Sequence, residues 1–367
     1  MITPHTFTAD WLTHLRSRYR KIDPSIAEKM IFALGLVEQL GRAHLPFVFK
    51  GGTCLVLLLG AVRRFSVDVD IVTSATAADI QAVLDQVCQH PPFQRYDYDA
   101  RRSTKDAIPR GHYYVYYEPA LALQRSAPYI ALDVLHEAHG YPQLFEAAVA
   151  SEFLQLAGEP QRVLVPSVES IAGDKLTAFA PTTTGIRYGQ DKALEIIKQL
   201  FDVGLLFDQV AHVEQVAQSY FATVVKELHY RQLTTLTAAD VLQDTIQTAL
   251  LLAQLQLNRP IPNKVAAQEL GAGIRAFANF LLADKFREEH AAVSAAKAAY
   301  LATRLLVADF TDLPRYPTPS SPPVPITDQR LNYLNKLRSA PIALFYWQHT
   351  IQLLSQHDRL PLLLTRS

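Results

Sequence analysis

The spacing of hydrophobic residues along this 367-residue chain changes once, near Pro166. Before that point, short strand-like runs alternate with helical patterns, and after it helical spacing dominates. Strands that alternate with helices build a sheet covered by helices. The pattern therefore predicts an α/β or α+β domain with a mixed sheet in residues 1–165 and a helical domain in residues 166–367. Six prolines between Pro314 and Pro325 predict an extended connector inside the second domain.

The same patterns predict the individual elements. In the first domain, two helices are expected within residues 7–43, divided at Asp23-Pro24-Ser25, with further helices at 53–59 and 76–88. Strands are expected at 47–49, 66–72, 93–99, 112–118, 129–135 and 162–166. In the second domain, helices are expected at 168–179, 192–207, 213–228, 239–255, 267–282, 291–307 and 330–354.

Composition excludes several classes of protein. The 35 Lys and Arg residues balance the 35 Asp and Glu residues, so the chain is not a uniformly basic nucleic-acid coat. Its two cysteines, Cys54 and Cys88, are too few for a disulfide framework or a Cys-rich zinc site. The N-terminal residues lack a signal-peptide pattern, and no apolar run approaches the roughly 18 residues of a membrane span. We therefore expect a cytoplasmic protein without a membrane partner.

The first candidate site feature is the Gly51-Gly52 pair, placed between a predicted strand and a predicted helix. Glycine is scarce, with 14 in 367 residues against a usual share of about 7%. Two glycines let the backbone turn tightly and approach a ligand, and the following helix start and the Thr53 hydroxyl offer donors to a phosphate. An ordinary strand-to-helix turn explains the pair equally well.

The second feature is Asp68-Val69-Asp70 in the predicted strand 66–72. Residues i and i+2 of a strand share a face, so both carboxylates are expected on one side. Their repulsion is relieved by a divalent cation with oxygen ligands, Mg²⁺ or Mn²⁺, which can also hold substrate phosphates. Two solvated aspartates are the alternative. The second Asp-x-Asp, Asp97-Tyr98-Asp99, lies among arginines without a glycine turn, and we interpret it as surface salt bridging.

A third carboxylate, Asp133, lies in the otherwise apolar predicted strand 129–135. An unpaired buried charge is costly, so Asp133 is expected to face a metal, a cation or water. A salt bridge with an arginine is the alternative. Two histidines, His136 and His139, lack the spacing of a zinc helix and are expected at the surface.

Four stretches carry a family resemblance. They are Lys50-Gly51-Gly52-Thr53, Arg64-Phe65-Ser66-x-Asp68-x-Asp70, Glu169-x-x-x-x-Asp174-Lys175-Leu176-x-Ala178 and Lys198-x-x-x-Asp202-x-x-x-Leu206. Together they resemble the motifs of the AbiEii/AbiGii toxin family, which includes the MenT toxins and belongs to the polymerase-β-like nucleotidyltransferase superfamily. The resemblance covers about residues 46–207.

The resemblance implies a role for each matching residue. Asp68 and Asp70 would hold two divalent ions on a nucleoside triphosphate (NTP), and Asp133 would complete the metal cluster and deprotonate the attacking hydroxyl. Lys175 would neutralise charge on the leaving pyrophosphate, and Asp202 would pair with Lys175. The residues implied in binding the nucleotide phosphates are Lys50, Gly51, Gly52, Thr53, Arg64 and Ser66. From the residues alone, an arginine before a strand, such as Arg64, is more often a solvated surface charge, and Asp202 could pair with Lys198.

The resemblance also implies a function. It is that of a metal-dependent nucleotidyltransferase toxin of a type IV-like toxin–antitoxin or abortive-infection system, with tRNA as the acceptor and a winged-helix regulator as antitoxin. Clustered cations at Arg95, Arg101, Arg102, Lys105 and Arg110, and at Arg187, Lys192 and Lys198, suit an RNA backbone. The alternatives are transfer to a small molecule or a protein, and a non-catalytic binding protein on the same fold.

Overall fold

The computed structural model describes residues 1–19, 22–104, 108–121, 127–282, 285–316 and 324–363. Its contacts divide the chain into two compact units. Unit 1 comprises Met1–Ser167 and Asn279–Asp284, and unit 2 comprises Val168–Ala278 and Lys285–Ser367. The return of a short segment from the second half of the chain to unit 1 is a tertiary feature that the sequence pattern does not indicate.

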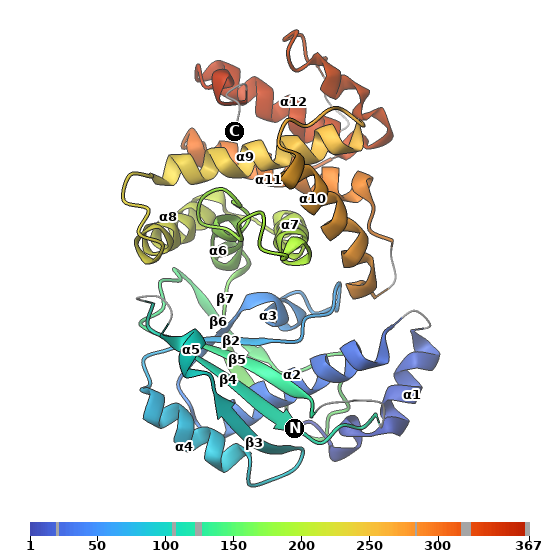
Figure 1. Cartoon of the computed structure of the whole chain (residues 1–367), viewed down its shortest axis with the longest axis vertical. Coiled ribbons are helices and arrows are strands. Elements are labelled where there is room, and N and C mark those ends of the chain that lie inside the picture. Colours follow the sequence, from blue (N-terminus) through green and yellow to red (C-terminus); the bar gives the residue numbers. More distant parts are fainter. Residues whose placement is uncertain (20–21, 105–107, 122–126, 283–284, 317–323, 364–367) are drawn as a thin grey trace. The chain divides into compact units, whose positions relative to one another are not determined.

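Unit 1 combines a sheet with helices (Figure 1). Its helical elements are η1 (Pro4–Phe7), α1 (Ala9–Arg18), α2 (Pro24–Arg42), α3 (Gly51–Leu58), α4 (Ala77–Val87), α5 (Ala100–Ser103) and the 3₁₀ turn η2 (Ala278–Phe280) at its junction with unit 2. Its strands are β1 (Val48–Lys50), β2 (Val69–Thr73), β3 (Phe93–Tyr98), β4 (Arg110–Tyr117), β5 (Tyr129–His136), β6 (Leu144–Ala148) and β7 (Arg162–Pro166).

In the described part of the chain, the strands form one seven-stranded sheet in the order β3-β4-β5-β2-β1-β7-β6. The β2–β5 and β1–β7 pairs are parallel, and the other neighbouring pairs are antiparallel. The sheet is therefore mixed, as expected from strands that alternate with helices before Pro166. The predicted mixed α/β fold followed by helices is confirmed.

The core of unit 1 lies on one face of the sheet. Phe49, Ile71, Leu132 and Val115, each at most 1% exposed, come from four strands and share this face. Helices α2 and α4 cover it: the Phe32 ring of α2 stacks on Tyr117 of β4 with ring centroids 3.9 Å apart, and α4 contacts β3. The polar residues at alternate positions of these strands consequently project from the opposite face.

Local signals explain where the covering helices begin. Pro24 starts α2, and the Asp23 carboxylate caps it by accepting from the backbone N–H groups of Ser25 and Ile26. Thr76 caps α4 through a reciprocal capping box with Asp79. Both helix starts were predicted from the sequence. Strand β6 was not, because its residues show neither regular alternation nor a run of β-branched side chains.

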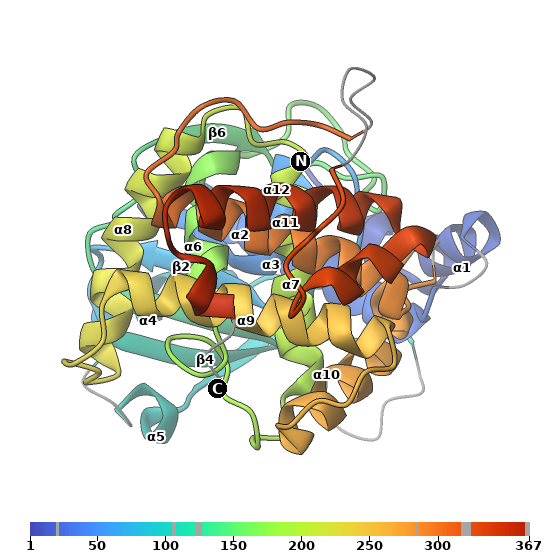
Figure 2. The same cartoon turned by 90° about the horizontal axis from the view of Figure 1, so that it is seen from above.

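Unit 2 is built from helices packed on one another. They are α6 (Val168–Ala178), α7 (Ala193–Phe207), α8 (Val213–Tyr230), α9 (Ala238–Gln256), α10 (Lys264–Phe277), α11 (Glu288–Leu306), η3 (Asn332–Ser339), α12 (Pro341–Gln356) and η4 (Leu360–Leu363). Helix α11 contacts α7, α9 and α12, so it forms the centre of the unit (Figure 2). Its small, buried alanine-rich surface, including Ala295 and Ala299, allows this close packing.

Two predictions about the end of the chain have different outcomes. The helix expected at 330–354 is divided, because Pro341 begins α12 and separates it from η3. The proline-rich connector predicted at 314–325 falls largely on residues 317–323, which lie outside the described residues. Within the described ranges, no helix has both the length and the apolar character needed to cross a bilayer.

Candidate active site

The strand register places Asp70 and Asp133 opposite one another. Asp70 of β2 pairs with Asp133 of the parallel strand β5, and Lys50 of β1 pairs with Asp70 on its other side. Residues at paired positions project to the same face, and neighbouring strands lie about 4.8 Å apart. All three side chains are half-buried on the polar face of the sheet. Residues from three separate stretches of sequence thus form one row, which we call the carboxylate row.

His112 extends the carboxylate row by one strand. It pairs with Asp133 across β4 and β5, and its Nδ1 is hydrogen-bonded to Asp133 Oδ1. The imidazole is buried, and the backbone N–H of His112 donates to Ser103 Oγ at 2.9 Å. Sequence reasoning missed His112. Only the register between β4 and β5 identifies it, because a single histidine in a tyrosine-rich strand carries no motif.

Asp68 falls inside the predicted strand 66–72 but just outside the observed strand β2. Strand β2 begins at Val69 instead of Ser66, so Asp68 precedes the ladder and is exposed. Its backbone is held by Thr53, whose buried hydroxyl donates to the Asp68 carbonyl oxygen at 2.6 Å. A hydroxyl has one proton to donate. In this structure the Thr53 hydroxyl uses that proton to hold the Asp68 backbone, and its contact with a phosphate stays a prediction.

The two glycines of α3 contact the side chains of the predicted site. Gly51 has φ +77°, and a Cβ atom there would lie 2.0 Å from Asp70 Oδ2. A Cβ atom on Gly52 would lie 2.4 Å from Arg64 Nη2 and 2.7 Å from Ser66 Oγ. The pair is thus more than an ordinary turn: each glycine leaves room for a side chain of the site.

Arg64 is a buried residue. It is 6% exposed, and its Nη1 donates to the Phe65 carbonyl at 3.0 Å. Its backbone forms a bridge with Leu281, and the Phe65 N–H donates to the Phe280 carbonyl at 2.7 Å. Of the two sequence-based alternatives, a solvated surface charge is wrong. The segment that returns to unit 1 helps to fix Arg64 beside Gly52.

The remaining predicted site residues, Lys175 and Asp202, lie in unit 2. Lys175 Nζ of α6 is 3.0 Å from Asp202 Oδ2 of α7, and the two side chains are 9% and 0% exposed. Gln199 also accepts from Lys175, at 2.9 Å. The predicted ion pair is therefore present, while Lys198 pairs with Glu195 at 2.9 Å.

Of the two motifs interpreted as non-catalytic, Asp97-Tyr98-Asp99 forms a surface salt bridge as expected, whereas only His139 of the two histidines is exposed and His136 is half-buried. Asp97 pairs with Arg95 at 2.8 Å, and both side chains are about half exposed. The hydrogen bond from Arg95 holds the pKa of Asp97 below its usual value. Asp99 caps α5 by accepting from the Arg102 N–H at 3.0 Å. His136 is hydrogen-bonded through Nδ1 to the Ala75 carbonyl.

The donor set of the site suits a hard divalent cation. Asp68, Asp70 and Asp133 offer only carboxylate oxygens, which Mg²⁺ and Mn²⁺ prefer over nitrogen and sulfur ligands. Among the described residues, no three His, Cys, Asp or Glu side chains are already arranged around a metal position. The chemistry of the residues therefore fits the metal, while closure of the carboxylates around it would have to accompany binding.

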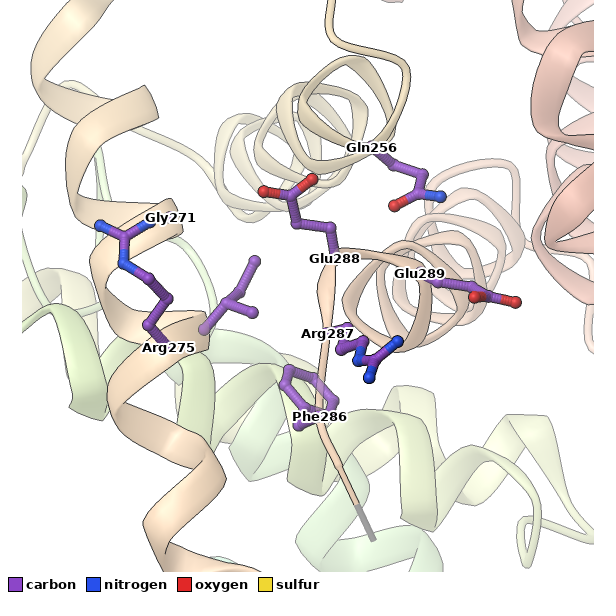
Figure 3. A pocket seen from close by; sticks show the side chains of 8 residues that line it. Gln256, Gly271, Arg275, Phe286, Arg287, Glu288 and Glu289 are labelled. Carbon is purple, nitrogen blue, oxygen red and sulfur yellow. The ribbon is translucent and has the colours of Figure 1, made fainter.

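A pocket of about 410 Å³ lies in unit 2, among α9, α10 and the start of α11 (Figure 3). Its lining combines the apolar side chains of Ile274 and Phe286 with Arg275 and Glu288. It contains none of the site residues predicted from the sequence.

Comparison with known proteins places the chain in a family. A model described as "Nucleotidyl transferase AbiEii toxin, Type IV TA system" matches residues 36–294. Two solved Helicobacter pylori structures, a candidate nucleotidyltransferase and JHP933, are each 16% identical, with a TM-score of 0.42; they cover 77% and 78% of this chain and 94% of their own. No curated protein matches. The chain is thus a nucleotidyltransferase and belongs to the AbiEii family of toxins of type IV toxin–antitoxin systems, enzymes that use an NTP substrate and have an antitoxin partner.

Proposed function

We propose that this chain transfers a nucleoside monophosphate from an NTP to the 3′-terminal hydroxyl of a tRNA and releases pyrophosphate. The carboxylate row beside the Gly51-Gly52 turn carries the proposal. Lys50, Asp70 and Asp133 lie on neighbouring strands, and the N-terminal N–H groups of α3 follow directly after Lys50. Such a set can bind a triphosphate and a metal at once, which a simple binding module does not require.

The three aspartates are the proposed ligands of Mg²⁺ or Mn²⁺. Two such ions, when bound, supply positive charge to the attacking and leaving oxygens of an in-line displacement at phosphorus. Asp70 and Asp133 approach the site from paired strand positions, and the Thr53 hydrogen bond orients the backbone that carries Asp68. The fixed backbone of each aspartate limits the reorganisation that metal binding needs.

The proposed reaction conserves atoms and electrons at each centre. The acceptor hydroxyl oxygen forms a bond to the α-phosphorus while the bond from that phosphorus to the α,β-bridging oxygen breaks. Pyrophosphate leaves with the electron pair of the broken bond, and the hydroxyl proton passes to the Asp133 carboxylate. His112, hydrogen-bonded to Asp133, holds this carboxylate in position.

The cations and small residues around α3 are the proposed binding site for the phosphates of the NTP. Lys50, Arg64 and Ser66 would contact the triphosphate together with the N–H groups of Gly51 and Gly52. Thr53 serves by positioning Asp68. In unit 2, Lys175 would neutralise charge on the leaving pyrophosphate, with its ammonium group held by Asp202.

As the toxin of a type IV-like toxin–antitoxin or abortive-infection system, the enzyme would act in the cytoplasm, where NTP and tRNA are available. Its proposed antitoxin is a winged-helix regulator encoded beside it. Cations near the carboxylate row, including Arg102 and Arg110, favour RNA over a small cationic acceptor, which would require an acidic pocket.

The decisive experiment incubates the protein with Mg²⁺, total cellular RNA and each α-³²P-labelled NTP in turn. The proposal predicts label in tRNA and none after Asp68→Ala/Asp70→Ala. Asp10→Ala/Asp85→Ala removes the same charge from two exposed helix positions and is expected to label tRNA like the wild type. Label in protein or small molecules, or label that persists in the Asp68→Ala/Asp70→Ala variant, would overturn the proposal.

A further inference from the structure

Three tyrosines share the face of the sheet that carries Asp133. In the β4–β5 register, His112 pairs with Asp133 and Tyr116 pairs with Tyr129. Because side chains alternate along a strand, Tyr114 and Tyr116 project to the same side as His112. Tyr113 and Tyr117 project to the other side and are at most 1% exposed in the core. The strand thus divides its four tyrosines into two buried and two partly exposed residues.

The partly exposed tyrosines form one aromatic cluster. The ring centroids of Tyr114 and Tyr129 are 4.7 Å apart, and those of Tyr116 and Tyr129 are 5.7 Å apart, both edge to face. Tyr129 is 41% exposed. Large aromatic rings that are partly exposed at neighbouring positions mark a binding surface, because covering them with another flat group is energetically favourable.

Two arginines lie against these rings. The Arg95 guanidinium stacks over the Tyr116 ring with its central carbon 3.6 Å from the centroid. Arg102 Nη1 donates to the Tyr114 hydroxyl at 3.2 Å, and that hydroxyl donates to Asp99 Oδ2 at 3.0 Å. Both arginines are exposed. Asp97 and Asp99 are the nearby acids: Asp97 pairs with Arg95, and Asp99 accepts from the Arg102 N–H and from the Tyr114 hydroxyl.

The aromatic cluster includes a residue of β5, the strand that carries the proposed catalytic base Asp133. Tyr129 is four residues from Asp133 on the same strand, a span of about 13 Å at about 3.3 Å per residue. Sheets that present aromatic side chains at alternate positions stack two or three unpaired bases, and arginines bind the intervening phosphates. A base-paired stem hides its bases and cannot use such rings.

We propose that Arg95, Arg102, Tyr114, Tyr116 and Tyr129, here the tyrosine–arginine strip, bind the single-stranded 3′ end of the RNA acceptor. Bases stack on the tyrosines, and the terminal hydroxyl is directed along β5 to Asp133. This inference rests on the proposed function. Stacking on tyrosine rings does not involve hydrogen bonds to the edges of the bases. The strip is therefore expected to bind an unpaired end largely independently of its sequence.

The test measures binding separately from catalysis. A fluorescein-labelled RNA hairpin with a four-nucleotide 3′ overhang and the same hairpin with a blunt end are titrated by fluorescence anisotropy without NTP. The wild type is expected to bind the overhang RNA more tightly. Tyr116→Ala/Tyr129→Ala should lose about tenfold or more in affinity for it, because each stacked base contributes about 1–3 kcal/mol. Its affinity for blunt RNA should not change.

Two controls separate stacking from folding. Tyr116→Phe/Tyr129→Phe keeps the rings and is expected to bind within about twofold of the wild type. Tyr98 is as exposed as Tyr129 but pairs with the buried Tyr113, so it projects from the opposite face, and Tyr98→Ala should bind normally. Equal binding of overhang RNA by the wild type and Tyr116→Ala/Tyr129→Ala would overturn the role assigned to the strip. A wild type with no preference for overhang RNA over blunt RNA would overturn it as well.

The outcome is distinguishable from failure of the proposed function. If the wild type labels tRNA but the alanine variant binds and labels overhang RNA equally well, the strip is wrong and the function stands. If the wild type binds the overhang through the strip but transfers no nucleotide to RNA, the proposed function is wrong and the binding surface stands.

Discussion

The His112 imidazole and the Asp133 carboxylate are hydrogen-bonded across paired positions of β4 and β5. His112 is 6% exposed, whereas the Asp133 side chain is 35% exposed. A buried imidazole therefore orients a carboxylate that faces the polar side of the sheet. The adjacent strand places Asp70 beside the same carboxylate, so one short row joins the orienting residue to the proposed metal ligands.

The first prediction concerns this hydrogen bond. His112→Ala should lower both Mn²⁺ affinity and the turnover of nucleotide transfer by about 10- to 100-fold, the usual cost of losing a residue that orients a metal ligand. His112→Asn retains a donor near the Nδ1 position and should recover most of both. Mn²⁺ binding is measured by isothermal titration calorimetry. His136→Ala on β5 serves as the control, and equal losses in His112→Ala and His112→Asn would contradict an orienting role.

The second prediction concerns Gly51. Gly51→Ala should abolish transfer, because its Cβ atom would displace the Asp70 carboxylate 2.0 Å away. Gly60 is the matched control: it also has positive φ, at +65°, but no atom lies within 4 Å of the position a Cβ would take. Both variants should lose about 1 kcal/mol of folding stability from backbone strain, as thermal unfolding can measure. Only Gly51→Ala should lose activity, and an active Gly51→Ala enzyme would show that Asp70 need not keep this position.

The third prediction separates packing from catalysis at Lys175 and Asp202. Lys175→Met alone should destabilise unit 2 by about 3–5 kcal/mol, because it removes the cation that faces a fully buried carboxylate. Lys175→Met/Asp202→Leu replaces the pair by apolar side chains and should restore most of the stability in urea unfolding. The double variant should nevertheless remain inactive. If Lys175→Met/Asp202→Leu recovered nucleotide transfer as well as stability, the pair would be a structural salt bridge without a role in catalysis.

The fourth prediction concerns pH and Asp244 of α9. Burial raises the pKa of Asp244 above its ordinary 3.8, although Thr182 N–H and the Thr183 hydroxyl each donate to it at 2.8 Å. Above pH 3.8 and up to the raised pKa, the folded chain binds more protons than the unfolded chain, so this residue's stabilising contribution falls as pH rises through that window.

Asp244→Asn removes the titrating group but keeps an acceptor oxygen. The stability of the wild type relative to this variant should therefore decrease as pH rises from about 4 through the raised pKa. Urea unfolding at a series of pH values measures the difference. Curves that remain parallel across the series would contradict a raised pKa at this position.

Much of the secondary structure could be predicted because its signals are local. The Asp23-Pro24 start of α2, the Thr76 cap of α4 and the strand β7 follow from a few neighbouring residues each. The strand that carries Asp70 was predicted to begin too early, at residue 66. The Asp68 backbone is held by a hydrogen bond from Thr53, which the alternation of polar and apolar residues does not reveal. Strand β6 was missed for lack of a pattern.

The sequence by itself determined the two-part pattern of elements, the glycine turn and the identity of the candidate carboxylates. Hydrophobic period, capping and motif spacing act over a few residues, so they can be read in one dimension. Only the tertiary structure decided which strands are neighbours. That order placed Asp133 beside Asp70, set His112 behind it, and divided the β4 tyrosines between core and surface. Strand order depends on contacts between residues far apart in the chain, whose pairing leaves no local trace in the sequence.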